Sequence, residues 1–263
     1  MKNTRKAAFL CLAATVFLLF SCQKRQEKAA EKVTITVAAA ASLEKAFTGD
    51  LIPLFTQKNP GIQVEGVYDS SGKLQTQIEQ GLGADVFVSA AQKQMDALVS
   101  GGFIKNESVK PLLQNRLALI KPKGVETAVA DFATIGAAKT QIAVGDPQSV
   151  PAGQYAKEAL TTLGVWDSVE GRLSLGSNVT ETLNWVAQAS AEVGIVYATD
   201  AASSANVEVI ALLPDGILSA PVIYPAAVVA ASAKPAEAAA FAAFLGSPEA
   251  LAIFEKYGFS SAK

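Results

Sequence analysis

Five short stretches of the sequence share one chemical character, because each is small, mostly neutral and leads from an apolar run into a segment with helical spacing. They are 38–43 (AAAASL), 69–74 (DSSGKL), 88–92 (VSAAQ), 146–153 (DPQSVPAG) and 177–180 (SNVT). A helix that starts at such a turn leaves its first backbone N–H groups unpaired and carries about half a positive charge there. Several such helix starts, pointed at one place, would bind an anion without any Arg or Lys.

The helix starts in these turns are predicted at Ser42, Ser71, Ala90, Ala152 and Val179. In open α/β sheets ligands bind beyond the carboxyl ends of the strands, which is where all five turns fall. The hydroxyls of Ser42 and Ser71 would add two more donors. The alternative for each serine taken singly is a plain N-cap without a ligand. The repetition of the pattern in one chain favours an anion site.

Other chemistries find less support in the residue types. The chain contains no His, which excludes Ser-His-Asp and Cys-His catalysis and every His-based metal site. The run Ser70-Ser71-Gly72-Lys73 is similar to part of a phosphate loop, but Leu74 stands where the full pattern needs Ser or Thr. A paired acid and base could be drawn from Asp69, Asp85, Asp146 and Asp200, although Asp is common at turns for structural reasons.

Composition and charge narrow the class of protein further. Half of the residues are hydrophobic and 17% are charged, which is typical of a well-packed globular protein. The formal net charge is −2 and the pI about 5.4, so nothing supplies the basic surface of a nucleic-acid-binding protein. About 230 residues follow the N-terminal segment, and that length favours two lobes.

The N-terminus is typical of a secretory signal. Lys2, Arg5 and Lys6 precede an apolar run, 7–20, which is shorter than the roughly 20 residues that span a bilayer. An uncleaved membrane anchor is the alternative.

The end of the apolar run, Leu19-Phe20-Ser21-Cys22, resembles the lipobox of bacterial lipoproteins. The resemblance implies a signal peptide over 1–21, removed by cleavage before Cys22, and acylation of Cys22. Cys11 would then be discarded, so the mature chain would have no free thiol and no disulfide. The charged stretch 22–32 is interpreted as a solvated tether.

The order of elements predicts an α/β fold. Short apolar or alternating runs indicate strands, and amphipathic runs between them indicate helices. The predicted strands are 33–39, 61–68, 84–89, 117–120, 141–144, 193–197, 207–213 and 222–229. The predicted helices are 42–58, 72–80, 92–99, 151–163, 179–189, 236–245 and 248–257, the last with Ser247 as N-cap. The alternation over most of the chain favours parallel sheets covered by helices.

Taken together, several motifs resemble the substrate-binding proteins of molybdate ABC transporters, over essentially all of 33–260. They are 39–43 (AAASL), Ser70-Ser71-Gly72-x-Leu74, 84–90 (ADVFVSA), Gln92-Lys93-x-Met95-Asp96, 143–147 (AVGDP), 150–157 (VPAGQYAK), 194–197 (GIVY), 224–229 (YPAAVV) and 254–259 (FEKYGF).

The resemblance implies a fold and a set of contacts. The fold would be a two-lobed, periplasmic binding protein-like (type II) α/β structure with a hinge and an anion cleft between the lobes. Lobe 1 would comprise 33–113 and 223–263, and lobe 2 would comprise 114–222. Ser42 and Ser71 would donate through hydroxyl and backbone N–H groups, Ala90, Ala152 and Val179 through backbone N–H groups, and Tyr197 through its phenol. These residues would contact the oxygens of molybdate and not its metal. Asp69 is expected to point outward, because a buried unpaired carboxylate beside a dianion is costly. The alternative is an inward Asp69, which could accept a proton from a protonated oxyanion and would favour phosphate-like ligands.

The resemblance also implies a function. The protein would be a receptor and not an enzyme, would need no cofactor, and would capture molybdate or tungstate for an ABC permease. It would act as a monomer outside the cytoplasm, held through Cys22 to the membrane on its periplasmic face or on the outer cell surface, and would bind no nucleic acid. Three alternatives remain: the same receptor class with another oxyanion (sulfate, thiosulfate or a dedicated tungstate site), a carboxylate-based hydrolase, and an adhesin or structural lipoprotein with a decayed site.

Overall fold

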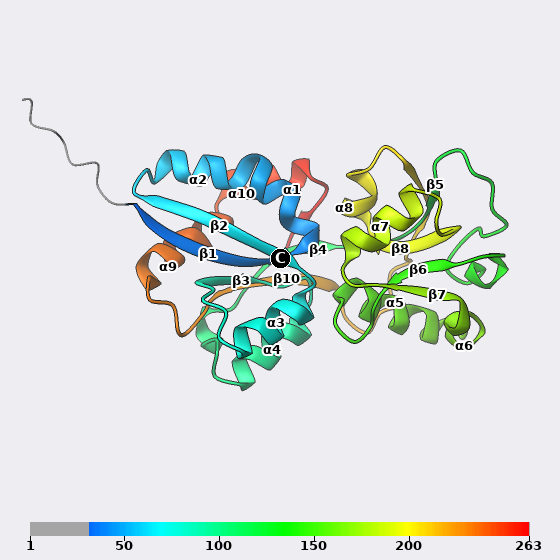
Figure 1. The fold of residues 1–263 in the computed structure, drawn as a ribbon, viewed down its shortest axis with the longest axis horizontal. Coiled ribbons are helices and arrows are strands. Elements are labelled where there is room, and N and C mark those ends of the chain that lie inside the picture. The colour runs from blue at the N-terminus through cyan, green and yellow to red at the C-terminus, as the bar shows by residue number, and fades with distance from the viewer. Residues whose placement is uncertain (1–31, 263) are drawn as a thin grey trace, which may run out of the picture. The chain divides into compact units, whose positions relative to one another are not determined.

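The computed structural model describes residues 32–262, and these are arranged around two β-sheets with helices on both faces of each (Figure 1). The predicted signal peptide 1–21, the acylated Cys22 and all of the predicted tether except Lys32 lie outside the described residues, so these stay predictions.

The first sheet has the strand order β11-β4-β10-β3-β1-β2. β1 pairs in parallel with β2 and β3, whereas β10 runs antiparallel to β3 and β4, and β11 runs antiparallel to β4. The strands are β1 (Val33–Ala40), β2 (Ile62–Asp69), β3 (Val86–Val88), β4 (Lys110–Asn115), β10 (Val222–Val228) and β11 (Ser260–Ser261).

The second sheet has the strand order β7-β6-β8-β5-β9. β6 pairs in parallel with β7 and β8, and β5 runs antiparallel to β8 and β9. The strands are β5 (Leu117–Pro122), β6 (Ile142–Gly145), β7 (Leu173–Gly176), β8 (Val193–Tyr197) and β9 (Val207–Leu212). β6 and β8 are buried along their whole length, as expected of strands covered by helices on both sides.

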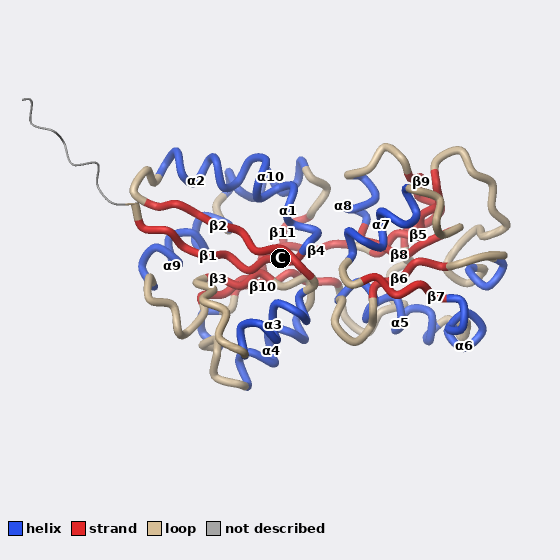
Figure 2. The backbone as a smooth tube through the Cα atoms, in the orientation of Figure 1, coloured by secondary structure: helices blue, strands red, loops and turns tan. Residues whose placement is uncertain are grey.

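Helices cover both sheets. On the first sheet α2 and α10 lie on one face, and α3 and α4 lie on the other; on the second, α7 and α5 lie on opposite faces (Figure 1). The helices are α1 (Glu44–Ala46), α2 (Ile52–Lys58), α3 (Ser71–Glu79), α4 (Gln92–Ser100), α5 (Pro151–Thr162), α6 (Trp166–Val169), α7 (Val179–Ala187), α8 (Ala198–Ala202), α9 (Pro235–Leu245) and α10 (Pro248–Lys256). We call the first sheet with its helices the first lobe, and the second sheet with its helices the second lobe. The tube view shows the loops that join their elements (Figure 2).

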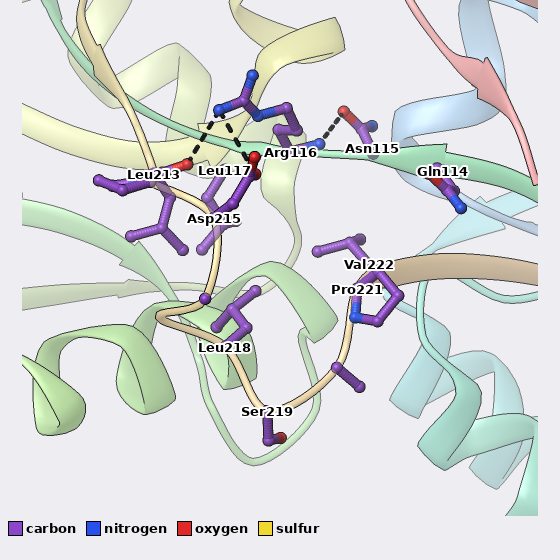
Figure 3. Close-up of a pocket in the computed structure, with 13 residues that line it drawn as sticks. Gln114, Asn115, Arg116, Leu117, Leu213, Asp215, Leu218, Ser219, Pro221 and Val222 are labelled. Atoms are coloured by element: carbon purple, nitrogen blue, oxygen red, sulfur yellow. Dashed lines mark hydrogen bonds and ion pairs between the residues drawn. The ribbon is translucent and has the colours of Figure 1, made fainter.

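Two connections join the lobes, and Figure 3 shows them beside each other. The first is Arg116, between β4 and β5, and the second is the segment 213–221 between β9 and β10. The guanidinium of Arg116 donates to the carbonyl oxygen of Leu213 at 3.2 Å and lies 3.9 Å from the carboxylate of Asp215. A cavity of about 400 Å³ lies between the two connections. The predicted lobe boundaries, at 113/114 and 222/223, stay predictions.

The alternation favoured parallel sheets, and β1 with β2 and β3, and β6 with β7 and β8, do pair in parallel, whereas β5 and β10 do not. Each follows a connection between the lobes and enters its sheet in the antiparallel sense. Alternation of strands and helices predicts parallel neighbours only where a helix returns the chain to the same end of the same sheet. The predicted helix 42–58 is one helical stretch, but it holds a π-helical turn at Phe47–Leu51, around Gly49. The elements β4, β7, β11, α6 and α8 were not predicted.

The apolar core runs through both lobes, and large aromatic side chains are buried in it. Phe47, Phe55, Phe241 and Phe254 pack edge to face or tilted, with ring centroids 4.9–6.1 Å apart. Within residues 32–262 no single helix has the length and apolar character to cross a membrane. Only α9 and α10 taken together do, and they are bent by 59° at their junction.

Candidate functional site

A small cavity is lined by all six residues that the sequence singled out: Ser42, Ser71, Ala90, Ala152, Val179 and Tyr197. The other lining residues are Ala40, Ala41, Asp69, Ser70, Val150 and Pro151. Both lobes contribute, because β1, β2 and α3 belong to the first and α5, α7 and β8 to the second. The structure therefore brings together residues that are as far apart in the sequence as 42 and 197.

Four of the six residues lie at the start of a helical segment. Ser42 is in the 3-10 turn that follows β1, Ser71 is the first residue of α3, and Val179 is the first residue of α7. Ala152 is the second residue of α5 and follows Pro151, which has no N–H to offer. First-turn N–H groups have no partner within their own helix, and each helix start carries partial positive charge. The cavity wall is therefore suited to a small anion.

The predicted helix start at Ala90 is wrong, because α4 begins at Gln92 with Ala91 as its N-cap, and the backbone groups of Ala90 are already hydrogen-bonded to other lining residues. Its N–H donates to Ser71 Oγ at 2.9 Å, and its carbonyl oxygen accepts from the Tyr197 hydroxyl at 3.3 Å. An anion that takes the Ala90 N–H must share it with Ser71. As an acceptor from Ala90, the Ser71 hydroxyl keeps its own proton free to donate.

Ser42 is held by a chain of hydrogen bonds that starts at Asn115, the last residue of β4. Asn115 donates through its amide nitrogen to the Tyr224 hydroxyl oxygen at 3.2 Å, and Tyr224 Oη lies 3.0 Å from Ser42 Oγ. Because Asn115 is the donor to Tyr224, Tyr224 has its own proton to donate to Ser42. That leaves the proton of Ser42 for an oxygen atom in the cavity.

Charge on the cavity wall comes from a carboxylate and not from a cation. Among the described lining residues the only charged one is Asp69, whose side chain is 26% exposed. Its Oδ1 accepts from the Ser70 N–H at 2.7 Å, the Asn178 amide at 3.3 Å and the Lys73 ammonium at 3.5 Å. Asp69 was expected to point outward; it lies on the wall, and these three donors offset its charge.

Two buried groups, Tyr224 and Asp200, contact the lining residues Ser42 and Tyr197 from outside the cavity. Burial raises the pKa of Tyr197 and of Tyr224 well above 10, so both phenols stay protonated and able to donate. Tyr197 ends β8, as predicted, and is also the N-cap of α8. Its backbone N–H donates to Asp200 Oδ2 at 3.2 Å, and burial raises the pKa of Asp200 to about 7.

Direct hydrogen bonds close the lobes over the cavity. The Gly72 N–H donates to the Ser149 carbonyl oxygen at 2.9 Å, and the Gln94 amide donates to Gln154 Oε1 at 3.1 Å. At another edge, the Lys45 ammonium donates to the Ser203 carbonyl oxygen at 2.8 Å. The cavity is therefore enclosed by contacts that exist only while the two lobes are together.

Sequence reasoning missed four residues of this site: Asn115, Tyr224, Asn178 and Ser70. Tyr224 lies in a quoted motif (YPAAVV) but received no role, because a tyrosine in an apolar strand is equally typical of a core position. Asn178 had a usable signal, since Asn before a helix is a common N-cap, and its side chain does accept from the Glu181 N–H at 2.9 Å. Its contact with Asp69 depends on how the lobes meet.

Comparisons with known proteins agree on one class. The family model described as bacterial extracellular solute-binding protein matches residues 35–260. The chain is 36% identical over 260 residues to the putative ABC transporter substrate-binding lipoprotein YvgL of Bacillus subtilis strain 168, covering 98% of this chain and 99% of that protein. It is 40% identical over 239 residues to the molybdate-binding protein ModA of Escherichia coli K12, covering 88% and 90%. The periplasmic molybdate-binding protein of Azotobacter vinelandii superposes with a TM-score of 0.75 at 25% identity, covering 87% of this chain and 100% of that one.

Proposed function

Because the chain belongs to the family of bacterial extracellular solute-binding proteins, we propose that it captures molybdate or tungstate in the cavity between its lobes and delivers it to an ABC permease. The relatives named above support the ligand, since one is a molybdate-binding protein of Escherichia coli and another is one of Azotobacter vinelandii. The two-lobed type II binding-protein fold expected from the sequence is confirmed by the same structural neighbour.

One observation carries the proposal: helix starts from both lobes converge on a cavity whose described lining includes no Lys or Arg. The ligand would be bound by donors to its oxygen atoms from six residues: Ser42, Ser71, Ala90, Ala152, Val179 and Tyr197. Backbone dipoles and neutral hydroxyls stabilise a dianion without forming a salt bridge. A fully deprotonated tetrahedral anion offers only acceptors, which matches a wall of donors.

The family is one of receptors for transport, so the expectation that the protein is not an enzyme is confirmed. The carboxylates that could have formed an acid–base pair have structural partners instead. Asp85 accepts from the Thr36 N–H and the Ser232 hydroxyl, each at 2.7 Å, and Asp146 accepts from the Gln148 N–H at 2.9 Å. Binding without chemistry is the role that remains for the cavity.

The mechanism is a hinge closure driven by the ligand. The anion first meets the donors of one lobe, and closure about the two connections then brings those of the other. Closure is favoured to the extent that the ligand binds the closed state more tightly than the open one. The enclosing contacts, such as Gly72 to Ser149, form in the same step.

The setting of the receptor is part of the proposal. Cys22, acylated after removal of 1–21, would anchor the protein outside the cytoplasm, and 22–32 would let the lobes stand off the membrane. The similarity to a relative that is named a lipoprotein supports an anchor. The protein would act as a monomer that meets a membrane permease, without a cofactor and without nucleic acid.

A thermal melt of the full chain in detergent, with molybdate, tungstate, sulfate or phosphate added in turn, tests the ligand. A ligand at 100 times its dissociation constant stabilises the folded state by about 2.7 kcal/mol, which for a chain of this size raises the melting temperature by roughly 5–10 °C. We expect that shift with molybdate and tungstate and not with the other two. A shift with sulfate or phosphate alone would change the ligand within the same class, and no shift with any of the four would reject the site.

The site assignment is tested by Ser42→Ala and Ser71→Ala. Each should weaken molybdate binding by about 1.5–3 kcal/mol, as expected for a hydrogen bond lost to a charged group. Unchanged affinity in both variants would contradict the assignment while leaving the receptor class in place.

A further inference from the structure

The hydroxyl of Ser70 is a buried polar group on the cavity wall that the proposed contacts do not use. Ser70 lines the cavity and is 3% exposed. Its Oγ has no hydrogen-bond partner among the described residues. A buried hydroxyl without a partner loses its hydration and gains nothing in return, so native proteins rarely keep one. Its presence beside Ser71 indicates a partner that is not part of the chain.

Helix capping does not account for this hydroxyl. Ser70 is the N-cap of α3, where a serine side chain normally accepts an N–H from the first turn, but its side chain makes no such bond. An N-cap side chain usually accepts from the N–H of the second or third helical residue. The second residue of α3 is Gly72, and its N–H donates instead to the Ser149 carbonyl oxygen in the other lobe. Elsewhere in the chain Asn178 and Ser247 do cap their helices through the side chain.

The backbone of Ser70 is fully paired, which leaves the hydroxyl as its only group for a ligand. The Ser70 N–H donates to Asp69 Oδ1 at 2.7 Å, and its carbonyl oxygen accepts from the Leu74 N–H at 3.0 Å. The neighbouring serines differ, because Ser71 Oγ accepts from the Ala90 N–H and Ser42 Oγ is bonded to Tyr224.

We propose that Ser70 Oγ donates a hydrogen bond to the bound oxyanion, so that the pair Ser70 and Ser71 holds the ligand through two adjacent hydroxyls. Ser70 is then a binding residue in addition to the six named above. An oxyanion oxygen supplies the acceptor that the chain lacks, and it would satisfy the hydroxyl only in the loaded, closed protein. This inference rests on the proposed function, since it needs an oxyanion in the cavity.

The test is Ser70→Ala in the full chain, purified in detergent, with sodium molybdate as the probe. We expect the dissociation constant from calorimetry to rise by about 10- to 100-fold, the scale of a hydrogen bond to a charged group. The melting temperature without ligand should stay the same or rise, because the variant removes an unpaired buried hydroxyl. If Ser70 instead capped α3, the melting temperature without ligand should fall, because loss of an N-cap destabilises the ligand-free protein.

Two further variants keep the outcomes separate. Ser70→Cys keeps the shape of the side chain but replaces the hydroxyl with a larger thiol that is a much weaker donor, so it should lose affinity like Ser70→Ala. Ser71→Ala reports on the proposed site itself. A dissociation constant for both Ser70 variants less than about fivefold above wild type, with Ser71→Ala weakened, would overturn the role of Ser70 alone. A lower melting temperature of ligand-free Ser70→Ala would overturn it in favour of capping. A wild-type protein that binds no molybdate would overturn the proposed function and this inference together.

Discussion

The backbone N–H of Gly72, in the first turn of α3, donates a 2.9 Å hydrogen bond to the carbonyl oxygen of Ser149, in the turn that precedes α5. A Cβ atom at Gly72 would lie 2.4 Å from that oxygen and 2.8 Å from Ser149 Cα, both of them backbone atoms that cannot rotate away. The two residues belong to different lobes. The space that Gly72 leaves empty is therefore needed for closure and not for the packing of either lobe.

Gly72→Ala should separate ligand affinity from the stability of the ligand-free protein. Closure would be opposed by a clash that costs about 1–3 kcal/mol, so molybdate binding should weaken by that amount. The ligand-free melting temperature should be unchanged or slightly higher, because Ala is a better helix former than Gly. Calorimetric titration together with a melt of the free protein checks both parts.

Gly83→Ala is the matched control for this variant. It lies in the same lobe, and a Cβ atom there would have no heavy atom within 4 Å. Its molybdate affinity should equal that of the wild type. Equal affinity for Gly72→Ala as well would mean that the ligand-bound protein does not close as the structure does.

Tyr224→Phe tests whether the proton of Ser42 is directed into the cavity by its neighbour. The ring should stay in place, since it packs edge to face with Tyr197 at 5.6 Å and with Phe259 at 5.4 Å between centroids. Without the Tyr224 hydroxyl, Ser42 is free to turn, and we expect molybdate binding to weaken by about 1 kcal/mol.

The double variant Ser42→Ala with Tyr224→Phe tests whether Tyr224 affects the ligand only through Ser42. If Tyr224 acts through Ser42, the double variant should bind no more weakly than Ser42→Ala alone, because groups that share one interaction are not additive. Fully additive losses would show that Tyr224 affects the ligand by another route.

Asn178→Asp should speed the release of the ligand. The side chain would keep its cap on α7, where Oδ1 accepts from the Glu181 N–H, but it would lose the amide that donates to Asp69 Oδ1 at 3.3 Å across the lobes. It would also place a second carboxylate opposite Asp69. Stopped-flow dissociation of molybdate should therefore be faster, by about tenfold for a loss near 1.4 kcal/mol.

The swapped pair, Asp69→Asn with Asn178→Asp, restores one donor and one acceptor in the reverse order. Its dissociation rate should return towards that of the wild type. If the swap releases the ligand as fast as Asn178→Asp alone, the contact between Asp69 and Asn178 does not hold the lobes together.

Asp200 should make stability depend on pH near neutrality. Burial raises its pKa from 3.8 to about 7, while the Tyr197 N–H and the charge of Lys45 oppose the rise. Between these two pH values the folded protein holds a proton that the unfolded chain has lost, so stability falls as pH rises towards about 7 and levels off above it. Two other titratable groups lie near Asp200. The charge of Asp200 raises the pKa of Tyr224, and Glu44 lines a second cavity that Asp200 also lines.

Asp200→Asn isolates this effect, because the amide oxygen still accepts from the Tyr197 N–H and carries no charge. Between pH 6 and pH 8 the melting temperature should fall further in the wild type than in the variant. The difference corresponds to a change of a few kcal/mol at most in the free energy of unfolding. Molybdate stays a dianion over this range, so its binding should weaken with pH in the wild type and less in the variant. Parallel pH profiles for the two proteins would place the Asp200 pKa outside this window.

Features set by short stretches of chain were predictable from the sequence. The apolar runs of β6 and β8 indicated buried strands, and Ser247 was predicted as an N-cap; its side chain accepts from the Ala250 N–H at 3.2 Å. Less regular elements were missed. β4 is polar at both ends, and β11 has only two residues, which are a strand only because β4 lies beside them.

The sequence by itself determined that several helices start at small, neutral turns, because capping and hydrophobic periodicity act within a few residues. It therefore indicated an anion site and the residues that line it. Only the tertiary structure decided which hydroxyls are paired: Ser42 is bonded to Tyr224, 182 positions away, whereas Ser70 is left without a partner in the part of the chain that the structure describes. The hydrogen bond between Gly72 and Ser149 was likewise decided only by the tertiary structure. Such pairings depend on how two sheets and two connections bring distant backbones together, and no local pattern in the sequence encodes that distance.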